Sequence, residues 1–330
     1  RRKPMPQSAN QQVKQHNRNR IRELMRQKGS ATKQQLSTLS GLSVVTLGTL
    51  MAELLETGEV LEGATVSADF GRPATVYHFA ADHAHVLACC FLQHKGADVL
   101  ALSVADLQGK VLCQAECALK ADVPKQLLAI TKSYLQKDPS ISAVGIGIPG
   151  QAVNGKVLFC DIGSLAGVSL QKLLEEQTHL PIVIENDMNA TVYGYACRVQ
   201  PKEDECTVGV YFPLNQGPGA GILLGRRLLR GQNGMSGELG QLPMPVDWAK
   251  PPEPFEAIIS DFLQAINAIL APERMIVYRE EINTECLENC IQRSWPSIAV
   301  RPTIVTHAEL APDYALGMRM LTLKQLWPKT

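Results

Sequence analysis

The sequence predicts an α/β protein in which an N-terminal winged helix-turn-helix precedes two β-rich lobes. Residues 31–56 read as two short helices broken by Gly41, and residues 60–79 read as two strands around a loop. From about His83 onward, strand-like and helix-like segments alternate, which is typical of α/β architecture. The alternation recurs from Thr207, so we expect two lobes of related layout with a ligand cleft between them.

Length and composition indicate an ordinary globular protein. The chain has 330 residues, 45% of them hydrophobic and 19% charged, so two or three domains are expected. It contains no run of eighteen apolar residues and no apolar segment typical of a signal peptide near residue 1. Nine scattered cysteines favour a reduced, cytoplasmic protein, and we expect no membrane association.

The balanced net charge hides a basic N-terminal segment. Residues 1–36 contain ten Lys or Arg residues against the single acid Glu23, which gives this segment a charge of +9 and the remainder −9. Such a segment is most often a solvated tail. Directly before a candidate recognition unit, it more often contacts phosphates.

Local signals mark the helix-turn-helix. Thr32 and Gln35 can form a capping box on the first helix, and Gly41 suits the turn because glycine tolerates positive φ. Ser43 then caps a second helix, whose apolar residues at helical spacing predict a buried stripe: Leu47, Leu50, Met51 and Leu54. Four residues are left facing outward: Val45, Thr46, Thr49 and Glu53. An ordinary helical hairpin is the alternative interpretation.

The flanking segments complete a winged-helix pattern. We expect a flexible basic segment over residues 1–16 and a helix from about Asn17 to Lys28, several of whose arginines would stay free for a DNA backbone. Gly71, Arg72 and Pro73 lie in the loop of the strand pair, where Arg72 at the wing can reach a minor groove. The expected division is 17–81 for this unit and 82–330 for the α/β body. The first lobe would span about 82–190 plus the C-terminal helical end, and the second about 191–304.

Five motifs in this order resemble the ROK family of repressors, open reading frames and sugar kinases. They are GRPA at 71–74, GIGIPG at 145–150, IENDMNA at 184–190, GPGAGILL at 217–224 and GMSGELGQ at 234–241. The resemblance runs from about Asn17 to Leu326. It implies that the body is a two-lobed, actin-like (RNase H-like) sugar-kinase fold, in a bacterial, cytoplasmic, nucleoid-associated transcriptional regulator.

The winged helix-turn-helix supplies the candidate DNA contacts. We expect Val45, Thr46 and Thr49 to meet base edges, because small hydroxyl and methyl groups at the start of a helix suit the major groove. The candidates for the DNA backbone or the minor groove are Arg20, Lys33, Ser43 and Arg72.

The resemblance also implies sugar contacts. Asp187 stands where the family's kinases place the carboxylate that removes a proton from a sugar hydroxyl, and Asn186 lies beside it. Glu238 matches a family sugar-hydroxyl ligand. Both carboxylates could instead cap the helices that follow them.

Two elements that catalysis needs are altered relative to the family's kinases. The first phosphate-binding turn corresponds to FLQHKGAD at 91–98, where neither the acid nor the hydroxyl is present. Tyr278 and Arg279 replace the paired glycines near the nucleotide, whereas the glycine-rich stretch 217–221 is retained. Because phosphoryl transfer depends on positioning and charge neutralisation, we expect no catalytic residues, no cofactor and no enzyme activity.

The family's zinc site is altered as well. Gln241 stands in place of its histidine, and residues 242–259 contain no cysteine, so we expect no metal. The region after Trp248 is shorter than in the family, either because this branch lost it or because part of the natural chain is missing.

The expected function is that of a sequence-specific transcriptional repressor of carbohydrate-related genes. Its non-catalytic body would sense a sugar or sugar phosphate and form a homodimer or homotetramer on a palindromic operator. One alternative is a sugar kinase that retains a DNA-binding head. Another is a regulator whose body senses a protein, such as a component of a sugar phosphotransferase system.

Overall fold

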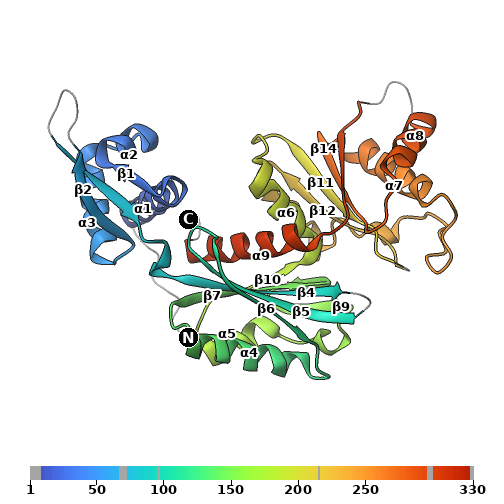
Figure 1. Ribbon diagram of the computed structural model, residues 1–330, viewed down its shortest axis with the longest axis horizontal. Coiled ribbons are helices and arrows are strands. Elements are labelled where there is room, and N and C mark those ends of the chain that lie inside the picture. The colour runs from blue at the N-terminus through green and yellow to red at the C-terminus, as the bar shows by residue number, and fades with distance from the viewer. Residues whose placement is uncertain (1–8, 67–72, 95–96, 215, 296–299, 328–330) are drawn as a thin grey trace.

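The computed structural model describes residues 9–66, 73–94, 97–214, 216–295 and 300–327. They form a small N-terminal head and two larger lobes (Figure 1). The two lobes with their sheets, together with the helix-turn-helix, confirm the predicted fold class. The division of the chain into domains at residues 81/82 and 190/191 stays a prediction.

The head is a helix-turn-helix beside a three-stranded antiparallel sheet of order β1-β3-β2. Its elements are α1 (Ala9–Lys28), β1 (Ser30–Thr32), α2 (Lys33–Ser40), α3 (Val44–Glu56), β2 (Val60–Val66) and β3 (Ala74–Phe79). The capping box of Thr32 and Gln35 is present, and Gly41 ends α2 with φ of 69°. As predicted, the apolar stripe of α3 is buried in the core of the head.

The prediction of a flexible segment over residues 1–16 was wrong for residues 9–16, which belong to α1. This part of α1 has no apolar periodicity, and its side chains make polar contacts. Gln15 Nε2 donates to Asn19 Oδ1 at 3.1 Å, and Lys14 forms an ion pair with Glu53 of α3. Residues 1–8 lie outside the described part of the chain.

Each lobe is built on a five-stranded mixed sheet. The first contains β4 (His85–His94), β5 (Ala97–Asp106), β6 (Val111–Ala118), β7 (Ile141–Ile148) and β10 (Ile182–Asn186). The second contains β11 (Cys206–Tyr211), β12 (Gly219–Leu224), β13 (Arg227–Leu228), β14 (Arg274–Tyr278) and β15 (Thr303–His307). Numbered within its own lobe, each sheet has the strand order 3-2-1-4-5, with the first three strands antiparallel and the last two parallel. The lobes are therefore topological repeats.

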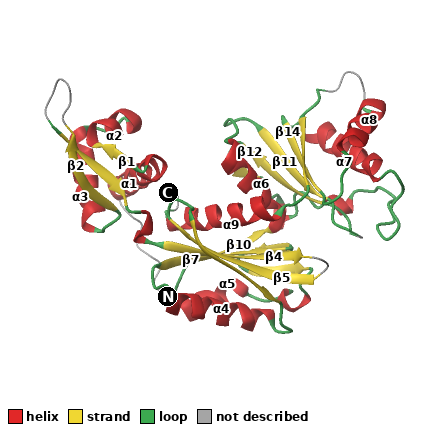
Figure 2. Cartoon of the chain, in the orientation of Figure 1, coloured by secondary structure: helices red, strands yellow, loops and turns green. Residues whose placement is uncertain are grey.

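Helices cover both faces of each sheet (Figure 2). In the first lobe, α4 (Val123–Lys137) and α5 (Leu170–Thr178) pack on one face, and α9 (Ala311–Leu326) packs on the other. In the second lobe, α7 (Phe255–Leu270) and α8 (Thr284–Ser294) lie opposite α6 (Asp187–Val199). The remaining elements are the hairpin β8 (Gly150–Val153) and β9 (Lys156–Cys160) and the short 3-10 turns η1 (Ala81–His83), η2 (Gly163–Leu165), η3 (Gln232–Gly234) and η4 (Leu239–Gln241).

The helices α6 and α9 cross with their backbones in close contact between the lobes. A Cβ atom on Gly194 would lie 1.9 Å from the carbonyl oxygen of Asp313, and one on Gly317 would lie 1.7 Å from that of Ala190. No side chain fits at either position, so glycine is required at both. The crossing brings the second lobe's helix against the helix that covers the first lobe's sheet.

The head and the body share one hydrophobic core. Leu47 of α3, Val86 of β4 and Leu323 of α9 belong to the same buried cluster. At the C-terminal end of α9, the Trp327 ring meets Phe79 of β3 edge-on, with centroids 6.2 Å apart. The helix α9 therefore runs from the junction of the lobes to the head (Figure 1).

Among the described residues, no single helix is long and apolar enough to cross a membrane. The pair α2 and α3, bent by 115°, passes that test together by length and composition only. The apolar residues of this pair, Leu36 and Leu47 among them, are buried in the head core.

Replacement of Gly194 tests the helix crossing. We expect Gly194→Ala to lower the free energy of unfolding by about 3 kcal/mol, because the new methyl group overlaps a backbone carbonyl that cannot move alone. Urea unfolding followed by circular dichroism measures the change. Gly48→Ala in α3 is the matched control, since its Cβ meets nothing within 4 Å. It should instead stabilise the protein by up to about 1 kcal/mol. Equal effects would contradict the proposed role of the crossing.

Candidate functional site

The outer face of α3 presents a compact exposed surface. Val45 is 83% exposed, and Thr46 and Thr49 are exposed as well. Thr46 N donates to Ser43 Oγ at 3.1 Å, and the two hydroxyl oxygens lie 2.9 Å apart, so Ser43 caps the helix from the same surface. These four predicted residues therefore lie together. The neighbouring Val44, 50% exposed, was missed because its place beside the cap carried no separate signal.

The basic residues of α1 are mostly paired with acids. Arg22 forms a buried ion pair with Glu59, and burial alone would raise the pKa of that carboxyl, but hydrogen bonds and charge from Arg22 leave it lowered. Arg26 pairs with Glu23 at 2.7 Å. Several arginines of this helix were expected to stay free, yet these two bind carboxylates within the head.

The predicted backbone contacts differ in their surroundings. Arg20 is exposed on α1. Lys33, at the start of α2, is half-buried, with its ammonium 5.2 Å from the centre of the Tyr77 ring. Arg72 lies outside the described residues.

A second polar cluster forms where β10 leads into α6. Asn186 caps α6 by accepting from Asn189 N at 3.0 Å, and its Nδ2 donates to Gly150 O and to Asp187 Oδ1. Asp187 also accepts from Met188 N at 2.7 Å. The helix cap is thus Asn186, not Asp187, and the Asp187 carboxyl keeps its second oxygen for another partner.

Glu238 reaches this cluster from the loop after β13. Its Oε1 accepts from Gln151 Nε2 of β8 at 3.1 Å, and it makes no capping bond to the turn that follows. A second link joins the same loop to the first lobe, since Arg230 Nη2 lies 2.5 Å from Glu185 Oε2. Sequence reasoning missed Gln151, Glu185 and Arg230. Only Glu185 had a signal, its place in the IENDMNA motif.

Other carboxyls of this polar cluster act on Asp187. The pKa of Asp187 is raised to about 7, mainly by burial and in smaller part by the charges of Asp161 and Glu238, and hydrogen bonds from Met188 and Asn186 oppose the rise. Burial also raises the pKa of Asp161. A carboxyl that titrates near neutrality can donate or accept a hydrogen bond, which suits the recognition of hydroxyl groups.

Side chains fill the place where the family's kinases carry paired glycines. Tyr278 is buried and donates from its hydroxyl to Asp313 Oδ2 at 2.8 Å. Arg279 lies over the Phe255 ring at 3.7 Å and donates to Phe212 O. The retained glycine stretch has a packing reason as well, because a Cβ on Gly221 would lie 2.2 Å from Met188 O.

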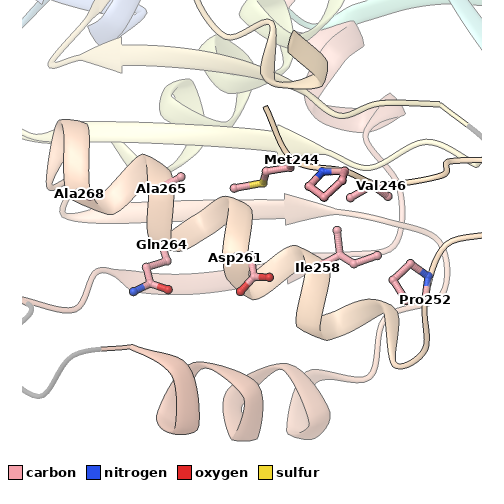
Figure 3. A pocket seen from close by; sticks show the side chains of 9 residues that line it. Met244, Val246, Pro252, Ile258, Asp261, Gln264, Ala265 and Ala268 are labelled. Carbon is pink, nitrogen blue, oxygen red and sulfur yellow. The ribbon is translucent and has the colours of Figure 1, made fainter. Parts of the chain in front are cut away.

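A hollow of about 530 Å³ lies elsewhere, on the outer surface of α7. Figure 3 shows Asp261 and Gln264 of the helix on one side and Met244 and Val246 on the other. Its lining includes none of the polar cluster around Asp187, so the hollow and the predicted sugar contacts are separate. Within the described ranges, no three His, Cys, Asp or Glu residues are grouped to hold a metal. The expected lack of a zinc site stays a prediction.

The raised pKa of Asp187 predicts a pH dependence of stability. In the unfolded chain this carboxyl titrates near 3.8, whereas in the folded protein it titrates at about 7. Between these values the folded protein holds the extra proton, so the free energy of unfolding falls as pH rises and the loss is complete above the folded pKa. In Asp187→Asn this fall in the free energy of unfolding with rising pH should be absent, and urea unfolding measured across the pH range tests this. Asp261→Asn is the control, and a profile of Asp187→Asn parallel to wild type would contradict the shift.

The chain is similar to the ROK family and to named repressors and sugar kinases. The profile of the ROK family matches residues 94–260. The xylose repressor of Bacillus subtilis (strain 168) is 24% identical over 221 residues, which cover 63% of this chain and 55% of the repressor, so the chain spans about half the length of that relative. The N-acetyl-D-glucosamine kinase of Vibrio cholerae is 32% identical over 106 residues, which cover 32% of this chain and 34% of the kinase.

A solved structure shares the fold over nearly the whole chain. It is the ROK family transcriptional regulator described as a homolog of the E. coli MLC protein. Its TM-score is 0.72 at 19% identity, covering 96% of this chain and 98% of that one. Because the ROK profile matches half of the 330 residues, the chain belongs to the ROK family.

Proposed function

We propose that this protein is a sequence-specific DNA-binding transcriptional repressor of carbohydrate-related genes. The observation that carries the proposal is the exposed, capped face of α3 within a complete helix-turn-helix. Apolar methyl and hydroxyl groups there suit base edges in a major groove. The similarity to xylose repressors over about half their length supports the same function.

The basic side chains would orient the head on the duplex. Arg20 is exposed and is the proposed phosphate contact, and Lys33 supplies a second cation at the start of α2. In this arrangement Val45, Thr46 and Thr49 specify the sequence, whereas Arg20, Lys33, Ser43 and Arg72 position the head. A palindromic operator would require an even number of heads, so the proposed assembly is a homodimer or homotetramer.

The body would act as the sensor of a sugar or sugar phosphate. Asn186 ends β10 of the first lobe, Asp187 begins α6, and Glu238 comes from a loop of the second lobe. A ligand bound to all three would compete with the Gln151–Glu238 hydrogen bond and change how the loop meets the first lobe. Because α9 continues from the junction of the lobes into the head core, such a shift can alter the head.

A sugar kinase is the second candidate, favoured by similarity to N-acetyl-D-glucosamine kinases. Asp187, with its pKa of about 7, has the chemistry of a general base. The buried Tyr278 and the stacked Arg279 oppose it, because they fill the place at the end of β14 that the family's kinases keep open with glycines. We therefore propose a non-catalytic body.

Arg20→Ala tests the phosphate contact. We expect it to weaken binding to all duplexes about equally and to lower the salt slope by about 0.9, the value for one phosphate. Fluorescence anisotropy against duplexes selected from a randomised library, repeated over a range of KCl concentrations, measures both. Thr49→Ala is the contrast, since it should change base preference and leave the salt slope intact. An unchanged slope in Arg20→Ala would exclude its phosphate role, and a wild type without any selected duplex would overturn DNA binding.

Ligand screening tests the sensor. Thermal shift against D-xylose, hexoses, N-acetylhexosamines and their phosphates should reveal a stabilising sugar, since a ligand at about 100 Kd adds about 2.7 kcal/mol. Asp187→Asn and Glu238→Gln should remove the shift, whereas Asp261→Asn, in the hollow on α7, should keep it. Loss only in Asp261→Asn would move the ligand site to that hollow. A coupled ATP assay on the same panel should show no turnover, and turnover abolished by Asp187→Asn would support the kinase instead.

A further inference from the structure

An acidic side chain interrupts the exposed face of α3. Glu53 follows Thr49 by one helical turn and Thr46 by two, so it lies along the surface proposed to face DNA. It is about one quarter exposed. A carboxylate at this position would repel the phosphates beside a major groove. Its place on the helix therefore needs an explanation.

The carboxylate of Glu53 is held by two cations from α1. Lys14 forms an ion pair with Oε1, and Arg18 Nη1 lies 3.9 Å from Oε2. Gln15 Oε1 accepts from Arg18 Nη2 at 2.6 Å, which orients the guanidinium. Two of the basic residues that made α1 resemble a phosphate-binding segment are thus engaged by one acid of α3.

This arrangement differs from the buried Arg22–Glu59 ion pair of the head. The Arg22–Glu59 pair is buried, with both side chains less than one tenth exposed, and joins α1 to the start of β2. In the Glu53 pair, Lys14 is 55% exposed and Arg18 is 29% exposed. Exposed pairs contribute little to stability. Because the Glu53 cluster is only partly buried, it is more readily explained by its effect on charge than by its effect on folding.

We infer that Glu53 is a specificity-determining residue that withholds Lys14 and Arg18 from DNA phosphates and so lowers sequence-independent affinity. The inference rests on the proposed DNA-binding function. Sequence-independent binding depends almost wholly on the number of phosphates neutralised, with a salt slope of about 0.9 for each. Base contacts from Val45, Thr46 and Thr49 do not depend on the number of phosphates neutralised. The ion pairs of Glu53 with Lys14 and Arg18 therefore raise the ratio of specific to non-specific affinity.

Glu53→Gln tests this inference, with Glu56→Gln as the matched control. Both variants remove one negative charge from α3, but Glu56 is exposed and stands outside the pair with Lys14 and Arg18. We expect Glu53→Gln to bind a scrambled duplex about tenfold more tightly, with a salt slope steeper by about one to two units. Its preference for the best duplex selected from a randomised library should fall, while Glu56→Gln should keep the wild-type slope. Equal slopes in the two variants, or weaker binding of both duplexes by Glu53→Gln, would overturn the inference.

A second variant tests the inference from the side of the cations. The triple variant Lys14→Gln/Arg18→Gln/Glu53→Gln removes the whole ion-pair cluster, so its affinity for the scrambled duplex and its salt slope should stay near those of wild type, whereas Arg20→Gln should lower both. Because the two cations are absent, the triple variant should also lack the steeper slope expected of Glu53→Gln alone. A shallower salt slope in the triple variant than in wild type would show that the cations already contact DNA in the wild type. A wild type that selects no duplex would refute the proposed function itself, while selection with unchanged slopes would refute only the role of Glu53.

Discussion

The close crossing of α6 and α9 is the contact on which the arrangement of the whole chain depends. It can form only because Gly194 and Gly317 carry no side chain where two backbones meet. The helix α9 covers the sheet of the first lobe, touches the second lobe at its N-terminal end and enters the head core at its C-terminal end. One helix thereby connects three bodies, and the packed interior of each leaves little room for it to shift independently.

Buried polar contacts gather at the two ends of this arrangement. Near the N-terminal end of α9, Asp313 is almost fully buried and accepts from Arg198 of α6 and from Tyr278 of β14. Near its C-terminal end, the Arg22–Glu59 pair lies beside Trp327. A buried carboxylate is costly unless it is bonded, so each contact favours one packing of the elements it joins. In the proposed sensor, a ligand between the lobes would act on the first of these contacts and the head would respond through the second.

The sequence and the structure agree best where the signal is local. The capping box of Thr32 and Gln35, the turn at Gly41 and the buried stripe of α3 all lie within a few residues of their partners. The start of α1 was missed because residues 9–16 have no apolar periodicity and make polar contacts, including the ion pair from Lys14 to Glu53. Such a contact joins residues far apart in the chain and leaves no periodic pattern.

The sequence by itself determined the helix-turn-helix, the alternation of strands and helices, and the positions where family motifs place Asn186, Asp187 and Glu238. These features depend on backbone preference and hydrophobic periodicity, which act over a few residues. Only the tertiary structure decided which polar side chains meet. It brought Gln151 to Glu238 and Arg230 to Glu185, and it paired Arg22 with Glu59 and Lys14 with Glu53. These pairings follow from how packed helices and sheets bring distant segments together, and the order of residues along the chain does not encode that proximity directly.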